Sequence, residues 1–185
     1  MKGSLAACGA CALLFVAGPV RALERQHHFG LDPSLSILKV DDKSTVSLGA
    51  GLGAHHTYDA NDQFQVLAEL NVSRVAANQQ QDFPTSPHTR PADVAYAMAG
   101  VGYVIDVMRF VPYLGLLVGG YRLAGGTLDS PLFIVGAEGA VGLDYAFTRH
   151  FSAGAGLRQH FLLTKMSTYP TYTTLLLRFE FVWGG

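Results

Sequence analysis

Polar and apolar residues alternate along the last strand-like segment of the chain, residues 171–183. One face of this segment is apolar and ends in the aromatic residues Phe181 and Trp183. The opposite face carries Arg178 and Glu180 between apolar neighbours. A sheet in a soluble core rarely places charges there, whereas a barrel with lipid outside and a polar lumen inside explains both faces. The segment therefore predicts a membrane-spanning strand.

The same two-residue period, bounded by turn-forming residues, recurs in eight segments of the chain. They are residues 27–40, 45–58, 64–74, 93–105, 108–123, 132–147, 151–163 and 171–183. The second, third, sixth and seventh segments alternate as the last one does, whereas the fourth and fifth are apolar on both faces. No helix is expected after the N-terminal region.

The hydrophobic runs have the length of spanning strands and are too short for spanning helices. The best helix candidate, residues 94–120, is interrupted by Asp106, Arg109 and Pro112. A spanning helix needs about 20 apolar residues, whereas a tilted spanning strand needs about 9 to 11. We therefore expect strands in this region as well.

Short and longer connections between the segments alternate. The short ones are residues 59–63, 106–107 and 148–150, and the longer ones are residues 75–92, 124–131 and 164–170. Only residues 41–44 break the rule, because they are short where a long loop is expected. An even strand number with short turns at one end and longer loops at the other is typical of bacterial outer-membrane barrels.

The composition agrees with a surface that lipid covers. Hydrophobic residues make up 49% of the chain and charged residues only 15%, whereas about a quarter of the residues of a soluble domain are charged. The formal net charge is -1 and no basic cluster is present, so a nucleic-acid partner is excluded.

The N-terminus has the three parts of a secretory signal, ending in small residues before a predicted cut after Ala22. We therefore expect a signal peptide at residues 1–22 and an outer-membrane barrel at residues 23–185. Cys8 and Cys11 both lie in the segment to be removed, so the mature chain has no thiol. Lipidation of Cys8 is disfavoured, because this residue precedes most of the apolar stretch.

The inward faces of the segments bring charges into one narrow lumen. The predicted lumen charge network consists of Glu69, Glu138, Asp144, Arg158, His160, Arg178 and Glu180. The number of residues between each side chain and the short-turn end of its strand estimates how deep that side chain lies in the lumen. These depths suggest that Glu69 pairs with Arg178 and Glu138 with Arg158. Buried charges need partners, because an unpaired one costs several kcal/mol. The network predicts a structural plug, and the alternative is a gate whose exchange of partners opens a small ion path.

Glycines on the predicted inner face fit a small, filled barrel. The chain has 21 glycines, and many of them alternate with larger residues on that face. About eight strands enclose just enough space for side chains. We therefore expect no open channel.

Aromatic residues gather near both ends of the segments, as in belts at two membrane–water boundaries. Membrane-interface anchors are expected beside the short turns at Tyr145, Phe147, Phe151 and Trp183. A second belt toward the longer loops is expected from Tyr96, Tyr121, Phe133, Phe161 and Tyr172.

No residue constellation is specific for catalysis, for a cofactor or for a metal. A hydrolase on such a barrel needs a nucleophile activated by a histidine, and His160 has no inward serine at the expected spacing. The adjacent histidines His27 and His28, like His55 and His56, point to opposite faces of a strand, so neighbours cannot chelate one ion together. We therefore expect neither an enzyme nor a cofactor site nor a metal site.

Four stretches carry a resemblance to a known family. They are the strand–turn–strand stretch of residues 142–158, the pair of stretches at residues 102–106 and 111–115, and the aromatic C-terminal strand. With them the whole mature chain resembles the small eight-stranded outer-membrane barrels of the OmpA transmembrane-domain, OmpX and OmpW type. The resemblance implies outer-membrane lipids as partners and recognition of the last strand by the barrel-assembly machinery. This machinery prefers an aromatic residue at the end of the last strand, whereas Gly184 and Gly185 follow Trp183 in this chain.

Together these features predict an all-β protein, an eight-stranded antiparallel up-and-down transmembrane barrel in the bacterial outer membrane. We expect a monomer with a side-chain-filled polar lumen and a structural or surface-interaction role. One alternative is a narrow pore for small solutes. The others are a soluble, exported lipocalin-like barrel, which would carry its apolar side chains inside, and a barrel-embedded lipid or peptide hydrolase.

Overall fold

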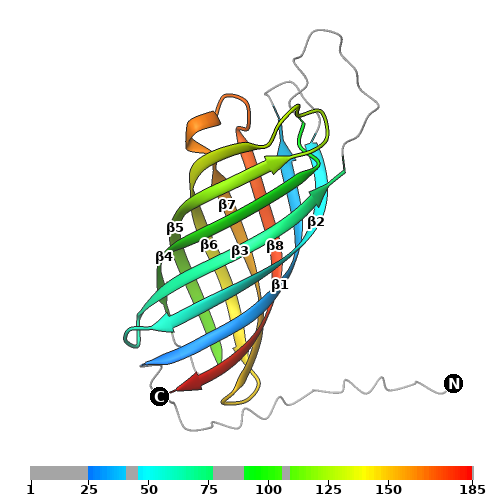
Figure 1. Cartoon of the computed structure of the whole chain (residues 1–185). Coiled ribbons are helices and arrows are strands. Elements are labelled where there is room, and N and C mark those ends of the chain that lie inside the picture. Colours follow the sequence, from blue (N-terminus) through cyan, green and yellow to red (C-terminus); the bar gives the residue numbers. More distant parts are fainter. Residues whose placement is uncertain (1–24, 41–45, 77–89, 106–108, 185) are drawn as a thin grey trace, which may run out of the picture.

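The computed structural model of the chain is a closed barrel of eight antiparallel strands (Figure 1). It describes residues 25–40, 46–76, 90–105 and 109–184. Several predicted features lie outside the described residues: the signal peptide with Cys8 and Cys11, the connections at 41–44 and 106–107, most of the loop at 75–92, and Gly185.

The eight strands follow the chain order around the barrel. They are β1 Gln26–Lys39, β2 Val46–Asp59, β3 Phe64–Val75, β4 Asp93–Val104, β5 Phe110–Ala124, β6 Leu132–Ala146, β7 Phe151–Phe161 and β8 Thr171–Gly184. The segments predicted from alternation agree with these bounds to within two residues at each end. The predicted fold class is therefore confirmed.

The first and last strands close the barrel. β1 pairs with β8 from Gln26 opposite Gly184 to Leu31 opposite Phe179, and again from Ser34 opposite Leu176 to Lys39 opposite Thr171. An open sheet edge in lipid would leave backbone N–H and C=O groups without water to pair with. Because each of the eight strands has a neighbour on both sides, the described barrel has no such edge.

One prediction fails beyond the end of β7, where a short 3-10 helix, η1 (Leu163–Lys165), replaces the predicted end of the strand. The strand ends at Phe161, and the next residue, Leu162, is buried in the lumen. The Lys165 N–H then donates to the Leu162 carbonyl at 2.9 Å and closes the helical turn. Among the described residues, no helix is both long and apolar enough to cross a membrane.

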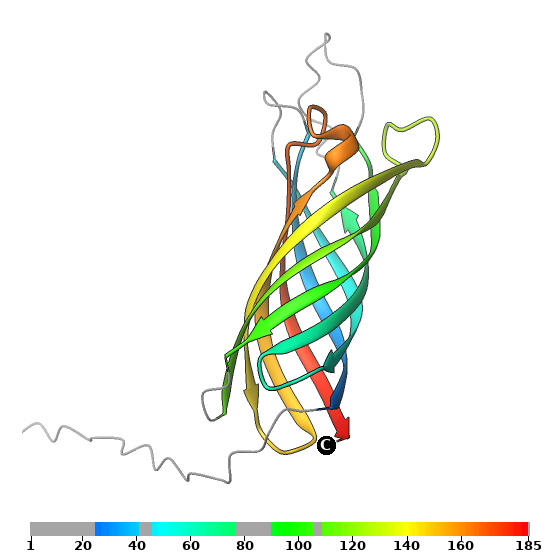
Figure 2. The ribbon, with the colours of Figure 1, turned by 90° about the vertical axis from the view of Figure 1, so that its left-hand side faces the viewer.

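The two ends of the barrel differ. The turns after β2 and β6 lie at the same end as the C-terminus of β8, and η1 lies at the opposite end (Figures 1 and 2). In the first turn the Asn61 side chain accepts hydrogen bonds from the Gln63 and Phe64 N–H groups, at 2.9 Å each. In the second turn the Thr148 hydroxyl accepts hydrogen bonds from the His150 and Phe151 N–H groups. Such side-chain bonds replace the water that the backbone of a tight turn would otherwise need.

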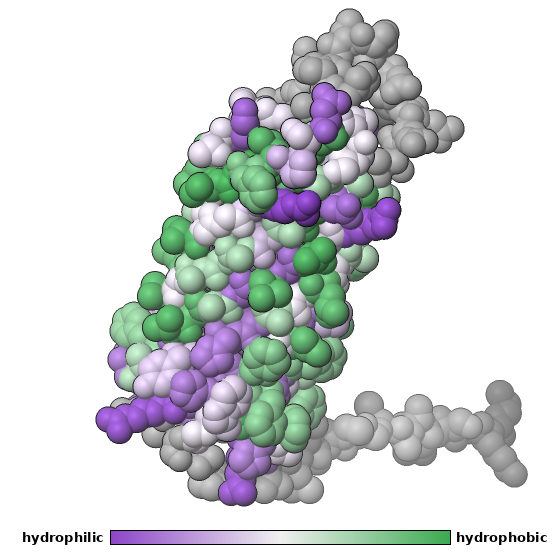
Figure 3. Space-filling view, viewed as in Figure 1, coloured by the Kyte–Doolittle hydropathy of each residue, from purple (hydrophilic) through white to green (hydrophobic). Residues whose placement is uncertain are grey.

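The outer wall is apolar and the inner wall is largely polar. Leu116, Val118 and Phe133 are 72%, 65% and 74% exposed on the outside, whereas Arg158 inside the barrel is fully buried. Figure 3 shows hydrophobic side chains spread over the middle of the visible wall, with strongly hydrophilic residues toward both ends. This arrangement is the inverse of a lipocalin-like barrel, and it fits a wall that faces lipid.

The predicted second aromatic belt is only partly correct. Phe133 and Phe161 face outward, but Tyr96, Tyr121 and Tyr172 are buried in the lumen at 5%, 1% and 0% exposure. Both faces of the fourth and fifth segments are apolar, so alternation could not assign an inner face to the first two tyrosines. The third tyrosine, Tyr172, shares the inward face of β8 with Arg178.

Two glycines, Gly100 on the inner face of β4 and Gly139 on the outer face of β6, lead to a prediction about stability. A Cβ at Gly100 would overlap the carbonyl oxygen of Leu116 on the neighbouring strand, whereas a Cβ at Gly139 would meet nothing within 4 Å. Gly100→Ala should therefore lower the free energy of unfolding by about 1 to 3 kcal/mol, and the matched control Gly139→Ala should change it by less than about 0.5 kcal/mol. Urea unfolding in lipid vesicles measures both values, and equal losses would contradict the close approach of β4 and β5.

Candidate functional site

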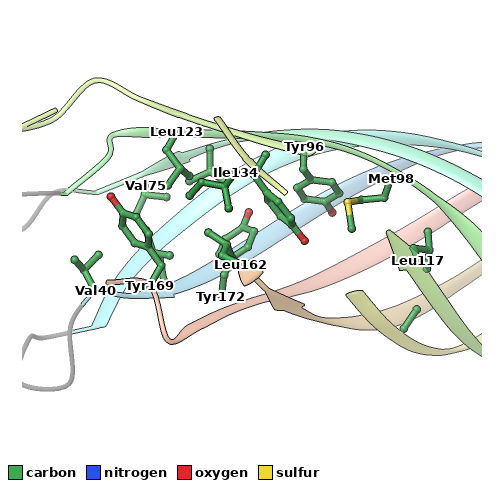
Figure 4. Packing of buried hydrophobic residues seen from close by; sticks show 14 of the residues in the cluster. Val40, Val75, Tyr96, Met98, Leu117, Leu123, Ile134, Leu162, Tyr169 and Tyr172 are labelled. Atoms are coloured by element: carbon green, nitrogen blue, oxygen red, sulfur yellow. The ribbon is translucent and has the colours of Figure 1, made fainter. Parts of the chain in front are cut away.

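The lumen is filled at two levels of different chemistry. The level nearer the short turns is a network of charged side chains, which we call the ion-pair level. The level nearer η1 is an aromatic and aliphatic cluster, which we call the apolar plug. Figure 4 shows labelled side chains of this cluster pointing into the interior of the barrel.

One centre of the ion-pair level is Arg178 on β8. Its Nη1 donates to Asp144 Oδ2 at 3.0 Å, and its Nη2 lies 2.6 Å from Glu180 Oε1. The guanidinium also lies over the Tyr113 ring, 4.5 Å from the ring centroid. Bidentate or two-partner contacts of this kind are the strong form of charge-assisted hydrogen bond.

The second centre is Arg158 on β7, which is fully buried. Its Nε donates to Glu69 Oε2 at 3.2 Å and lies 3.0 Å from Glu138 Oε1. Its Nη1 donates to the Tyr113 hydroxyl at 3.1 Å. Glu138 thus lies beside Arg158, as the depth count suggested, but Glu69 lies beside Arg158 and not beside Arg178. The stagger of neighbouring strands in a barrel shifts the levels that a simple residue count assumes.

His160 connects the ion-pair level to the apolar plug. Its Nδ1 lies 3.3 Å from Glu138 Oε2 and 3.0 Å from the Tyr121 hydroxyl. Its Nε2 lies 3.0 Å from the Thr174 hydroxyl, and its ring stacks on Tyr172 at 4.5 Å between centroids.

A carboxylate, a histidine and a hydroxyl in this order resemble a catalytic triad, which the sequence did not reveal because Thr174 comes from another strand. All three groups are at most 1% exposed, so a substrate has no path to the hydroxyl in this conformation. The arrangement ties Glu138, His160 and Thr174 together as part of the filled lumen.

Two histidines and two aspartates that were not predicted as site residues extend the ion-pair level. His55 Nδ1 lies 2.7 Å from Asp32 Oδ2, and His55 Nε2 lies 2.8 Å from Glu180 Oε1. His28 Nε2 lies 2.9 Å from Asp59 Oδ2. Only a doubly protonated ring can donate to two carboxylates at once. The signal for the two histidines was available, because one member of each adjacent histidine pair must face inward.

The apolar plug closes the other level. Its most deeply buried side chains have 0% to 1% exposure: Leu38, Val94, Leu117, Tyr121, Leu123, Leu162, Tyr169 and Tyr172. They come from β1, β4, β5, β8 and the connection between β7 and β8. Because side chains from opposite walls meet there, no residue alone closes the lumen.

The predicted interface anchors lie on the outer wall at the short-turn end. Tyr145 contacts Phe147 and Phe110, with ring centroids 4.9 and 5.1 Å apart. Phe151 and Trp183 both contact Phe181, at 5.4 and 5.9 Å between centroids. These residues form two aromatic clusters on the outer wall, and their anchoring role stays a prediction.

The part of the chain that the structure describes contains no group of three or more histidine, cysteine, aspartate or glutamate side chains that could hold a metal ion.

Comparison with known families and structures agrees with the architecture. The family model described as outer membrane protein beta-barrel domain matches residues 8–179. A search of curated proteins finds no significant match.

Solved structures similar to this chain include three small barrels. The neisserial surface protein A is 18% identical, with 84% of this chain and 95% of that chain covered and a TM-score of 0.61. The attachment invasion locus protein Ail of Yersinia pestis is 15% identical, with 86% and 99% covered and a TM-score of 0.56. The outer membrane protein OprG of Pseudomonas aeruginosa is 14% identical, with 88% and 98% covered and a TM-score of 0.57. At these identities the likeness concerns the fold.

The contacts of Arg158 predict a large effect of its removal. Arg158→Met leaves Glu69 and Glu138 buried without their cation, so the free energy of unfolding should fall by about 3 to 5 kcal/mol. The control Arg149→Met, in an exposed turn, should change it by less than about 0.5 kcal/mol. Urea unfolding in vesicles measures both changes.

A second variant separates charge from packing. Adding Glu69→Gln to Arg158→Met removes one uncompensated carboxylate and should return part of the lost stability. No recovery would indicate that the arginine acts through its volume alone.

Proposed function

The chain belongs to the outer-membrane β-barrel protein family, and on this premise we propose that it is a non-conducting barrel with a structural or surface-interaction role in the cell envelope. Membership in the family makes it an outer-membrane protein. The observation that supports the proposal is the burial of side chains at two levels of the lumen. At the ion-pair level Arg158 is fully buried, and at the apolar plug Leu123 and Tyr172 are fully buried.

The two levels oppose ion passage in different ways. An ion that crosses the apolar plug must lose its water, which costs many kcal/mol when no ligand replaces that water. An ion that crosses the ion-pair level must displace Arg178 or Arg158 from carboxylates that would otherwise remain unpaired. Both costs apply to the same path, so closure does not depend on one side chain.

A surface role fits the connections at the η1 end. Loops on a rigid scaffold commonly carry binding functions, and the barrel holds the ends of β7 and β8 in fixed positions. One similar structure is named as an attachment protein, which supports contact with other surfaces as the working hypothesis.

The alternative of a narrow pore is favoured by unpaired atoms in the ion-pair level. Among the described residues, buried atoms without a hydrogen-bond partner include Asp32 Oδ1, Asp144 Oδ1, Arg158 Nη2 and Arg178 Nε. Buried polar groups usually have a partner or a water. Water at these atoms would hydrate the short-turn half of the lumen, and a joint shift of several apolar-plug side chains, Leu162 and Tyr172 among them, would then complete a path.

Conductance of single proteins in planar bilayers separates the two functions. The wild-type protein should give no current steps above the bare bilayer, and Arg178→Ala should also be silent because the apolar plug still closes the lumen. A combined variant, Arg178→Ala with Leu162→Ala and Tyr172→Ala, should conduct.

Each variant is first checked for heat-modifiable migration on a denaturing gel, which reports a folded barrel. Steps from the wild-type protein would overturn the closed-barrel proposal. Steps from Arg178→Ala alone would favour a gate at the ion-pair level.

Export predicts a defined mature N-terminus. If the signal peptide ends at Ala22, N-terminal sequencing of the protein purified from outer membranes should begin at Leu23. A chain that retains Met1, or that carries a lipid on Cys8, would contradict the predicted processing.

A further inference from the structure

Two histidines on the outer wall lie beside each other at the short-turn end of the barrel. His27 is on β1 and His56 is on β2, and the register places them diagonally on the outward face, with His27 opposite Tyr58 and Phe29 opposite His56. His27 Nδ1 lies 3.2 Å from His56 Nε2. Their sequence neighbours His28 and His55 face the lumen, so the two pairs of adjacent histidines supply one cross-strand pair on each face.

The separation of the two nitrogens fits two ligands of one metal ion. With metal–nitrogen bonds of about 2.05 Å, two imidazole nitrogens lie about 2.9 Å apart at a right angle and about 3.3 Å apart at a tetrahedral angle. The observed 3.2 Å between His27 Nδ1 and His56 Nε2 falls in this interval. Neutral imidazole is a preferred ligand of copper, zinc and nickel.

Neighbouring rings hold one histidine of the pair in place. His27 stacks on Trp183 with centroids 5.5 Å apart and planes 14° apart, and it contacts Tyr58 at 4.8 Å. His56 lies 6.2 Å from Trp183. A ligand whose ring is already oriented loses less conformational entropy on binding, so the stack of His27 on Trp183 favours chelation.

The position of the pair leaves room for an ion and its water. His27 and His56 are partly exposed, and His27 lies one residue from the start of β1, at the level where Trp183 ends the apolar wall. Aromatic belts mark the membrane–water boundary in barrels of this kind. Water is therefore available there to complete the coordination of an ion that holds two protein ligands.

We propose that His27 and His56 form a surface site for a late first-row divalent metal ion, with copper bound most tightly. The ion binds a lone pair of each nitrogen in place of the hydrogen bond between them, the proton of that hydrogen bond moves to the other nitrogen of its own ring, and water fills the remaining positions. The ion links β1 to β2 beside the seam where β1 meets β8. Because the two ligands come together only in the folded barrel, the bound ion also stabilises that barrel. The sequence alone did not reveal this site, because its two histidines lie on neighbouring strands and only the register of these strands brings them together.

The single tryptophan of the chain reports on the site. Trp183 is the only tryptophan in the sequence and stacks on His27, so bound Cu²⁺ should quench its fluorescence. The experiment titrates Cu²⁺ into protein purified from outer membranes without a polyhistidine tag. Loss of even a supporting partner of a metal ligand lowers affinity about 10- to 100-fold. His27→Gln and His56→Gln should therefore each raise the half-quenching concentration at least about tenfold.

The matched control is His150→Gln. His150 lies at the same end of the barrel and stacks on Phe181 at 6.1 Å between centroids, but its Nδ1 lies 3.1 Å from the Val182 carbonyl oxygen and not beside another histidine. It should titrate as the wild type does. Heat-modifiable gel migration checks that every variant has folded.

Electron paramagnetic resonance of bound Cu²⁺ gives a second readout, which does not depend on Trp183. The wild-type spectrum should show coupling to two imidazole nitrogens, and each single variant should show fewer. Equal quenching in all four proteins, or a spectrum without two-nitrogen coupling in the wild type, would overturn the proposal and leave the pair as a hydrogen bond between two rings.

Discussion

Backbone hydrogen bonding in the absence of water is the constraint on which the rest of this structure depends. The pairing of β1 with β8 gives hydrogen-bond partners to the backbone of the two edge strands. This pairing is needed because lipid offers no partner to an exposed backbone N–H or C=O group. Once eight strands close, the width of the interior is fixed. The inner side chains must therefore fill a space whose size they do not determine.

Large side chains fill that space by lying over glycines. The Tyr113 hydroxyl lies where a Cβ would stand on Gly142 and on Gly156, and the Tyr121 ring lies in the same way over Gly136. Tyr113 then accepts a hydrogen bond from Arg158 through its hydroxyl. The ring also lies under the guanidinium of Arg178. A single tyrosine thus contacts both arginines, and the missing side chains on β6 and β7 allow it to do so.

Alternation predicted the fold well because lipid and lumen impose opposite requirements on the two faces of each strand. It was less informative for β4 and β5, whose inner faces contribute Tyr96, Met98 and Tyr121 to the apolar plug. Where both faces are apolar, period two cannot tell which one is inside. The sequence also could not predict which arginine pairs with Glu69, because that depends on the stagger between β3 and the strands across the lumen.

The seven predicted network residues do lie in the lumen, but the sequence revealed only part of the charge balance. They contain four carboxylates, two arginines and His160. The structure adds Asp32, Asp59, His28 and His55 to the same interior. The six carboxylates outnumber the two arginines, so protonated histidines would offset part of the remaining negative charge. His28 and His55 are placed to supply this positive charge, because each lies between two carboxylates.

This charge balance links the inner and outer walls of one strand pair. Since neighbours in a strand face opposite sides, placing His28 and His55 against the lumen carboxylates leaves His27 and His56 on the outer wall. A one-residue shift of β1 would expose His28 to lipid and turn His27 inward, and the same shift of β2 would expose His55 and turn His56 inward. The lumen network therefore fixes the register at the seam of the barrel, and the geometry of the outer pair follows from that register.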